Sequence, residues 1–158
     1  MKRLALLFSF IVLLAECTKN ADPQVVVYNM VEFKVVDSNG NDLLDPENVD
    51  QIDESQIKVF YKVDGQWQEV FDANMDYPRN FFIYQGEYSY RMRVFLNDTE
   101  SEILPETLIQ WSDSDADTIQ AEFNRTSSSI VLQKIWLNGD PIVSLSSDSS
   151  DLYYTLIK

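Results

Sequence analysis

Apolar and polar residues alternate along most of this chain, a pattern typical of half-buried β-strands. In the segment 24–37, valine and phenylalanine recur at mostly even spacings. The odd-numbered positions of 57–63 and the even-numbered positions of 88–96 are all apolar or aromatic. Further strands are predicted at 66–70, 81–84, 106–111, 118–124, 130–137, 141–145 and 152–157. No window shows a convincing helical period.

Short polar segments separate these predicted strands. Asn39-Gly40, Asp64-Gly65 and Asn138-Gly139 predict tight turns, because asparagine, aspartate and glycine tolerate positive φ angles. Acidic loops are predicted at 47–55 and 112–117. Eight or nine strands joined in this way indicate an all-β protein. We expect a single antiparallel β-sandwich, immunoglobulin-like or transthyretin-like, over residues 24–158.

Composition narrows the range of functions. The 158 residues suit one domain, and an aromatic content of 13% argues against disorder. The chain has 12 basic and 26 acidic residues, so its net charge of −14 disfavours nucleic acid as a partner. It contains no histidine, which excludes Ser-His-Asp catalysis and histidine-ligated metal sites. A single cysteine excludes an intramolecular disulfide.

The N-terminus has the features of a signal peptide. Lys2 and Arg3 precede an apolar run at 4–15, which is shorter than the roughly 20 residues of a membrane-spanning helix. The sequence Leu14-Ala15-Glu16-Cys17 follows, and it resembles the lipobox of bacterial lipoproteins, with Glu16 in place of the usual small residue. The resemblance implies a signal peptide at 1–16 and a tether at 17–23.

The same resemblance implies that Cys17 is acylated on sulfur, with palmitate for example, and becomes the mature N-terminus. Cys17, the strand content and the segment 33–47 (FKVVDSNGNDLLDPE) together look like small, uncharacterised Bacteroidetes cell-envelope lipoproteins. Thr18 is not the aspartate that retains some lipoproteins in the inner membrane. We therefore expect a lipid anchor in the bacterial outer membrane, on its periplasmic or its surface face.

Tryptophan residues are the first candidates for ligand binding. Exposed aromatic rings on a sandwich can stack against sugars, and Trp67 and Trp111 both lie beside predicted turns or loops. The alternative is that they pack across strands in the core, which is our expectation for Trp136.

Acidic residues suggest a second kind of site. Asp113, Asp115 and Asp117 alternate and could share a calcium ion, or could simply keep a loop solvated. The turn at 37–42 also has carboxylates and amides at ligand-like spacing, but its glycine suits a hairpin better. No cofactor is predicted, and calcium stays open as an alternative. Asp117-Thr118-Ile119 resembles the O-glycosylation acceptor of Bacteroidetes envelope proteins, although Thr118 could simply begin a strand.

No catalytic motif is found: there is no Gly-x-Ser-x-Gly and no aspartic-protease triplet. We therefore expect a non-enzymatic lipoprotein that acts as a binding or scaffolding module. The more specific form of this hypothesis is that its ligand is a glycan. An assembly lipoprotein with an envelope-protein partner is the alternative, and a small carboxylate-dependent hydrolase is the third class. A row of exposed aromatic residues would favour the glycan-binding protein, and an unpaired edge strand would favour the assembly lipoprotein. Two facing carboxylates in a deep cleft would favour the hydrolase.

Overall fold

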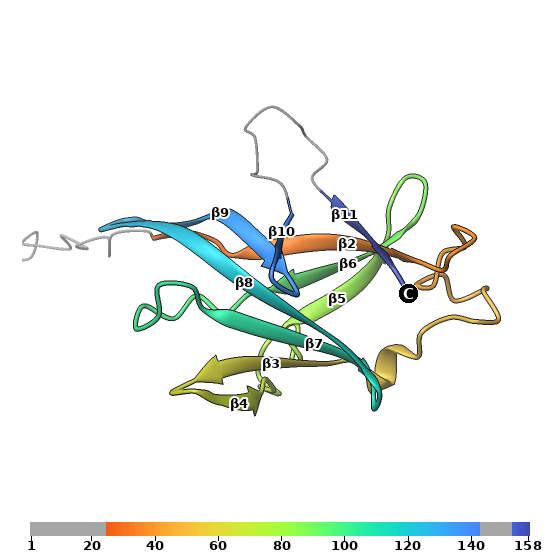
Figure 1. The fold of residues 1–158 in the computed structure, drawn as a ribbon, viewed down its shortest axis with the longest axis horizontal. Coiled ribbons are helices and arrows are strands. Elements are labelled where there is room, and N and C mark those ends of the chain that lie inside the picture. Colours follow the sequence, from red (N-terminus) through yellow and green to blue (C-terminus); the bar gives the residue numbers. More distant parts are fainter. Residues whose placement is uncertain (1–24, 143–152) are drawn as a thin grey trace, which may run out of the picture.

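Two β-sheets pack against each other in the computed structural model, which describes residues 25–142 and 153–158 (Figure 1). Sheet A has the order β1 (Val26–Tyr28), β9 (Ser129–Leu137), β8 (Asp115–Thr126), β7 (Glu106–Ser112), β3 (Lys58–Val63) and β4 (Gln66–Glu69), and β10 (Asp140–Pro141) pairs with β9. Sheet B has the order β11 (Tyr153–Ile157), β2 (Met30–Val36), β6 (Tyr90–Phe95) and β5 (Phe81–Gln85). The predicted all-β sandwich is confirmed.

Both sheets are mixed, which corrects the expectation of a wholly antiparallel sandwich. β1 runs parallel to β9, and β11 runs parallel to β2, while the other strand pairs are antiparallel. These parallel pairs join segments that are far apart in the sequence, so no turn dipeptide predicts them. The chain also changes sheet at Asn29, where one predicted strand divides into β1 and β2.

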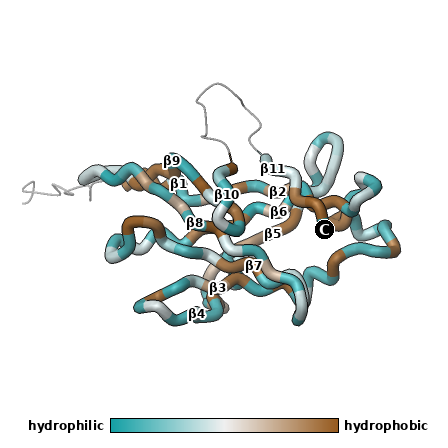
Figure 2. Tube along the Cα trace, viewed as in Figure 1, coloured by the Kyte–Doolittle hydropathy of each residue, from teal (hydrophilic) through white to brown (hydrophobic). Residues whose placement is uncertain are grey.

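The core lies between the sheets and contains most of the apolar positions of the alternating patterns, whereas Val25, Val27 and Tyr88 are exposed. Met92, Val94 and Leu96 of the predicted 88–96 face are fully buried, as are Ile57 and Val59. Figure 2 shows hydrophobic and hydrophilic positions alternating along several strands. Because a buried side chain of this size contributes about 1.5–3 kcal/mol, this register is strongly specified.

The predicted hairpin turns are present. Asp64 and Gly65 both have positive φ angles, as do Asn138 and Gly139, which matches the type I′ hairpin turn. At the third turn only Gly40 has a positive φ (87°). There the Asp37 carboxylate accepts the backbone N–H groups of Asn39 and Asn41 and closes the turn.

Three predicted segments either differ from the structure or lie wholly or partly outside the described residues. The acidic loop expected at 112–117 is mostly strand, because β8 already begins at Asp115. In the segment predicted as a strand at 141–145, only Pro141 belongs to a described strand, β10, and residues 143–152 lie outside the described residues. The predicted signal peptide, Cys17 and the tether also lie outside them. No helix in the described part of the chain is long and apolar enough to cross a membrane.

Candidate functional site

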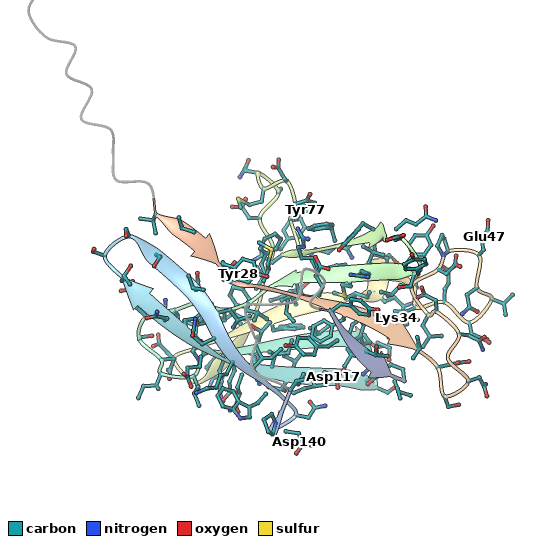
Figure 3. All side chains as sticks on the ribbon, turned by 90° about the horizontal axis from the view of Figure 1, so that it is seen from above. Tyr28, Lys34, Glu47, Tyr77, Asp117 and Asp140 are labelled. Atoms are coloured by element: carbon teal, nitrogen blue, oxygen red, sulfur yellow. The ribbon has the colours of Figure 1, made fainter. Side chains whose placement is uncertain are left out.

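A pocket of about 550 Å³ lies between the 71–80 loop and neighbouring strand ends, and we call it the Tyr77 pocket. It draws residues from the β1–β2 junction, from β3, from the 71–80 loop and from the end of β6 with the segment after it. Its lining residues are Asn29, Tyr61, Asn74, Met75, Asp76, Tyr77, Asn80, Phe95 and Asp98. In Figure 3 the loop that carries Tyr77 projects from one side of the sandwich.

Local hydrogen bonds fix the shape of the 71–80 loop. The Asp72 N–H donates to the Pro78 carbonyl (2.9 Å), and the Asp72 carboxylate accepts the N–H of Asn74. Asn80 has a φ of 55°, a left-handed conformation that asparagine tolerates better than most residues. The chain therefore turns sharply at Asn80 and enters β5, leaving Tyr77 on the pocket wall.

Tyr61 links the two sheets beneath the pocket. Its hydroxyl donates to the Phe95 carbonyl and accepts from Asn80 Nδ2, both at 2.9 Å. Burial raises the pKa of Tyr61 to about 12, the hydrogen bond from Asn80 lowers it in part, and the negative charge of Asp98 raises it. The hydroxyl is therefore neutral at physiological pH and serves both as donor and as acceptor.

We expect Tyr61→Phe to lower the free energy of unfolding by about 1 kcal/mol, because Asn80 Nδ2 and the Phe95 carbonyl both lose their hydroxyl partner. Urea unfolding measures this loss. Tyr88→Phe is the control, since the Tyr88 side chain is almost fully exposed. In the unmodified protein, ultraviolet titration should show one tyrosine that ionises only near pH 12. Equal stability of the two variants would contradict the linking role of Tyr61.

An aromatic row runs from the pocket across the outer face of sheet B. Tyr77 stacks on Phe82 with ring centroids 4.1 Å apart and an interplanar angle of 19°, and its centroid is 6.0 Å from that of Phe95. Phe82 in turn lies 5.7 Å from Tyr84. Tyr77 itself is 40% exposed, so part of its ring is open to a ligand.

The polar groups of the pocket are amides and carboxylates. Asn29 Nδ2 donates to Asp98 Oδ2 (3.2 Å), which orients both side chains at the pocket edge. Together with Asn74, Asn80 and Asp76 they provide both donors and acceptors. Among the described residues, no lysine or arginine lines the pocket, so its polar lining suits an uncharged, hydroxyl-rich ligand better than an anion.

Trp111 corrects one sequence-based prediction, because it is only 2% exposed and cannot stack on a ligand. Thr107 and Ile109, at the preceding inward positions of β7, are buried too, so the inward phase of this strand continues through Trp111. Trp67 is 40% exposed on the edge strand β4, where Lys62 Nζ lies 5.6 Å from its ring centroid, and it does not line the Tyr77 pocket. Trp136, expected in the core, is half-buried.

Asp117 is the centre of a buried network on another part of the molecule (Figure 3). Trp111 Nε1 donates to Asp117 Oδ2 and Asn138 Nδ2 donates to Asp117 Oδ1, both at 2.7 Å. Lys158 Nζ binds Asp117 and also Asp115. Burial alone raises the pKa of Asp117, but hydrogen bonds from Lys158, Asn138 and Trp111 outweigh it and hold the pKa below 3.8.

The three aspartates considered for calcium are thus divided. An ammonium group joins Asp115 and Asp117, whereas Asp113 lies exposed in the β7–β8 turn. Among residues 25–142 and 153–158, no group of three or more acidic or cysteine side chains is arranged to hold a metal ion. Thr118 lies within β8, where its N–H donates to Asn138 Oδ1 and its carbonyl accepts the Asn138 N–H. Its glycosylation stays a prediction.

Comparisons with protein-family models, with curated proteins and with solved structures found no match to this chain. The function must therefore be inferred from the geometry of the pocket. Most pocket residues were missed by sequence reasoning. The available signal was the polar 71–80 loop, in which Asn74, Asp76 and Asn80 surround the aromatic Tyr77.

Proposed function

We propose that this protein is a non-enzymatic binding module, anchored by lipid to a bacterial outer membrane, that recognises a neutral glycan in the Tyr77 pocket. The observation that carries the proposal is the combination of an exposed aromatic wall with amide and carboxylate groups in one pocket. Ligand sites commonly have this composition, with apolar walls and a few convergent polar groups.

The chemistry of a sugar matches both parts of the pocket. The C–H face of a pyranose packs on an aromatic ring, and the stacked pair of Tyr77 and Phe82 gives a supported platform for it. Sugar hydroxyls both donate and accept hydrogen bonds, as the amides of Asn29 and Asn74 and the carboxylate of Asp98 require. The aromatic row on sheet B offers further stacking positions for a longer glycan.

A glycan array probed with the detergent-solubilised full-length chain tests the proposal. We expect binding to a related set of neutral glycans, and we expect Tyr77→Ala to weaken it about tenfold, as for the loss of one stacking contact worth about 1.4 kcal/mol. Trp67→Ala is the matched control, because Trp67 is equally exposed but lies outside the pocket. If Trp67→Ala abolishes binding and Tyr77→Ala does not, the site is on β4. A blank array contradicts glycan recognition.

The lipid anchor has a separate test. We expect Cys17→Ser to release the protein from the membrane fraction, because the acyl chains and not the acidic body would hold it there. Fractionation of cells labelled with radioactive palmitate measures both anchoring and acylation. If the serine variant still sediments with membranes, lipidation of Cys17 is not the anchor.

The hydrolase alternative is supported by one feature, the presence of Asp76 and Asp98 in the same pocket. Incubating each bound glycan with the protein and separating the products by chromatography decides between binding and hydrolysis. Stoichiometric recovery of the intact glycan supports the binding module. Release of shorter products that stops in Asp98→Asn would replace it with an enzyme.

A further inference from the structure

In the part of the chain that the structure describes, the strand β1 leaves one sheet edge open to solvent. Val25, Val26, Val27 and Tyr28 have exposed fractions of 52%, 62%, 46% and 43%. They occupy consecutive positions, so apolar side chains lie on both faces of the strand. β1 is the first strand in the order of sheet A and pairs with β9 alone among the described strands.

The direction of the backbone groups follows from one hydrogen bond. The Val26 N–H donates to the Ser128 carbonyl at 3.0 Å, so this group points toward the β8–β9 hairpin. Because backbone groups of successive residues point to opposite sides of a strand, the N–H and C=O groups of Val25 and Val27 point away from β9. The open edge therefore presents two donors and two acceptors in the spacing of a β-ladder.

Other edges of sheet A carry a proline or a charged residue, which discourage further strand pairing, and the short strand β1 carries neither. β10, which pairs with the far end of β9, consists of Asp140 and Pro141, and a proline cannot donate to a ladder. β4 reads Gln66-Trp67-Gln68-Glu69 and ends in a charged residue. The segment Val25–Tyr28 contains no charge and no proline. An edge of this kind is a template for another strand.

We propose that β1 pairs with β1 of a second copy of this chain, antiparallel and across a twofold axis, so that sheet A continues through a dimer. In this register Val26 lies opposite Val26 of the second copy, and Val25 lies opposite Val27. Each Val25–Val27 pair then exchanges both of its N–H···O=C bonds, and the valine side chains cover one another on both faces.

Charge favours a second copy over a charged partner. The chain has a net charge of −14, but the segment that forms the seam is uncharged. Two copies can therefore meet there without a like-charge contact, whereas a basic strand finds no carboxylate on β1 to pair with. The seam would bury much less surface than the roughly 800 Å² that each partner buries in a standard stable interface. The dimer is accordingly weak in dilute solution and, with the lipid anchor proposed above, is favoured by confinement on a membrane.

Disulfide cross-linking of the full-length chain in isolated membranes tests this pairing. Opposed residues of a non-hydrogen-bonded antiparallel pair have Cα atoms about 4.5 Å apart, within the range of a disulfide. We expect Val26→Cys to give a reducible dimer on mild oxidation. The yield should be at least about five times that of Gln68→Cys on the polar edge β4, because an uncharged edge strand pairs with another strand more readily than an edge that carries a charge. The unmodified chain, run alongside, reports any cross-linking by Cys17.

A second substitution separates strand pairing from random collision. Val27→Pro in the Val26→Cys chain removes the outward N–H of Val27 but keeps the Val26 N–H that binds Ser128. We expect the dimer to disappear while the melting temperature changes little, and Val27→Lys serves if the proline variant unfolds. The proposal is overturned if Val26→Cys cross-links no more than Gln68→Cys, or if both changes at Val27 leave the dimer intact. Neither result depends on a glycan.

Discussion

Replacing Asp117 by alanine is expected to lower the free energy of unfolding by about 3–5 kcal/mol, the usual cost of breaking a buried ion pair. Asp117 is buried and its carboxylate accepts hydrogen bonds from Trp111, Asn138 and Lys158. Removing it leaves the ammonium of Lys158 and the indole N–H of Trp111 without their main acceptor. Since Lys158 follows β11 of sheet B, the substitution also breaks a link between the two sheets.

Thermal and urea unfolding measure this loss, and Asp115→Ala is the matched control. Asp115 also binds Lys158, but its side chain is 44% exposed, so its removal should cost less than about 1 kcal/mol. A loss for Asp117→Ala as small as that for Asp115→Ala would show that the network does not stabilise the fold.

The same carboxylate predicts how stability depends on pH. The pKa of Asp117 in the folded protein lies below its usual value of 3.8. Its ionisation therefore stabilises the fold fully above the unfolded pKa, and this contribution is lost as the pH falls through the folded pKa. Asp117→Asn should consequently lose less stability than the unmodified protein between about pH 5 and pH 2.

Glu32→Ala is expected to lower the free energy of unfolding by about 2–4 kcal/mol, because it leaves a mostly buried guanidinium without its counter-charge. On the outer face of sheet B, Glu32 accepts hydrogen bonds from Tyr84 (2.7 Å) and Arg93, and it lies 3.7 Å from Arg91. Arg91 is buried beneath Tyr153, whose ring centroid is 3.7 Å from the guanidinium carbon.

Glu122→Ala is the control for this substitution. Glu122 forms a comparable cross-strand pair with Lys134, but both side chains are exposed, so the pair should contribute less than about 1 kcal/mol. Urea unfolding of the two variants, with and without 1 M salt, measures the difference. The Glu122 pair should weaken with salt and the Glu32 network should change little. Equal losses would contradict a special role for the buried arginine.

Local patterns explain why much of the fold could be predicted. Alternation along single strands identified the buried residues within 57–63 and within 90–96, whereas Tyr88 of the same predicted face lies before β6 and is exposed. Two of the turn dipeptides have positive φ at both positions. The same rule, continued from Thr107 and Ile109, would have placed Trp111 in the core. The acidic residues that follow Trp111 favour an exposed loop and so conflict with this alternation.

The pairing of distant segments could not be predicted in this way. The parallel neighbours of β9 and β2 are set by the packing of the whole sandwich, not by any local sequence signal. The Tyr77 pocket has the same origin, since Asn29, Tyr61 and Asp98 are brought together only when the two sheets close. Single strands and turns are local properties of a sequence, whereas a pocket between them is not.

The change of sheet at Asn29 has a mechanical consequence. A pull on the N-terminal side of the domain reaches β1 first, and β1 contributes no buried side chain to the core. Such a force can peel β1 from β9 at the cost of a few hydrogen bonds, while the buried residues of β2, such as Phe33 and Val35, keep the sandwich closed. β1 would thus yield first under tension and lengthen the connection before the pocket is disturbed.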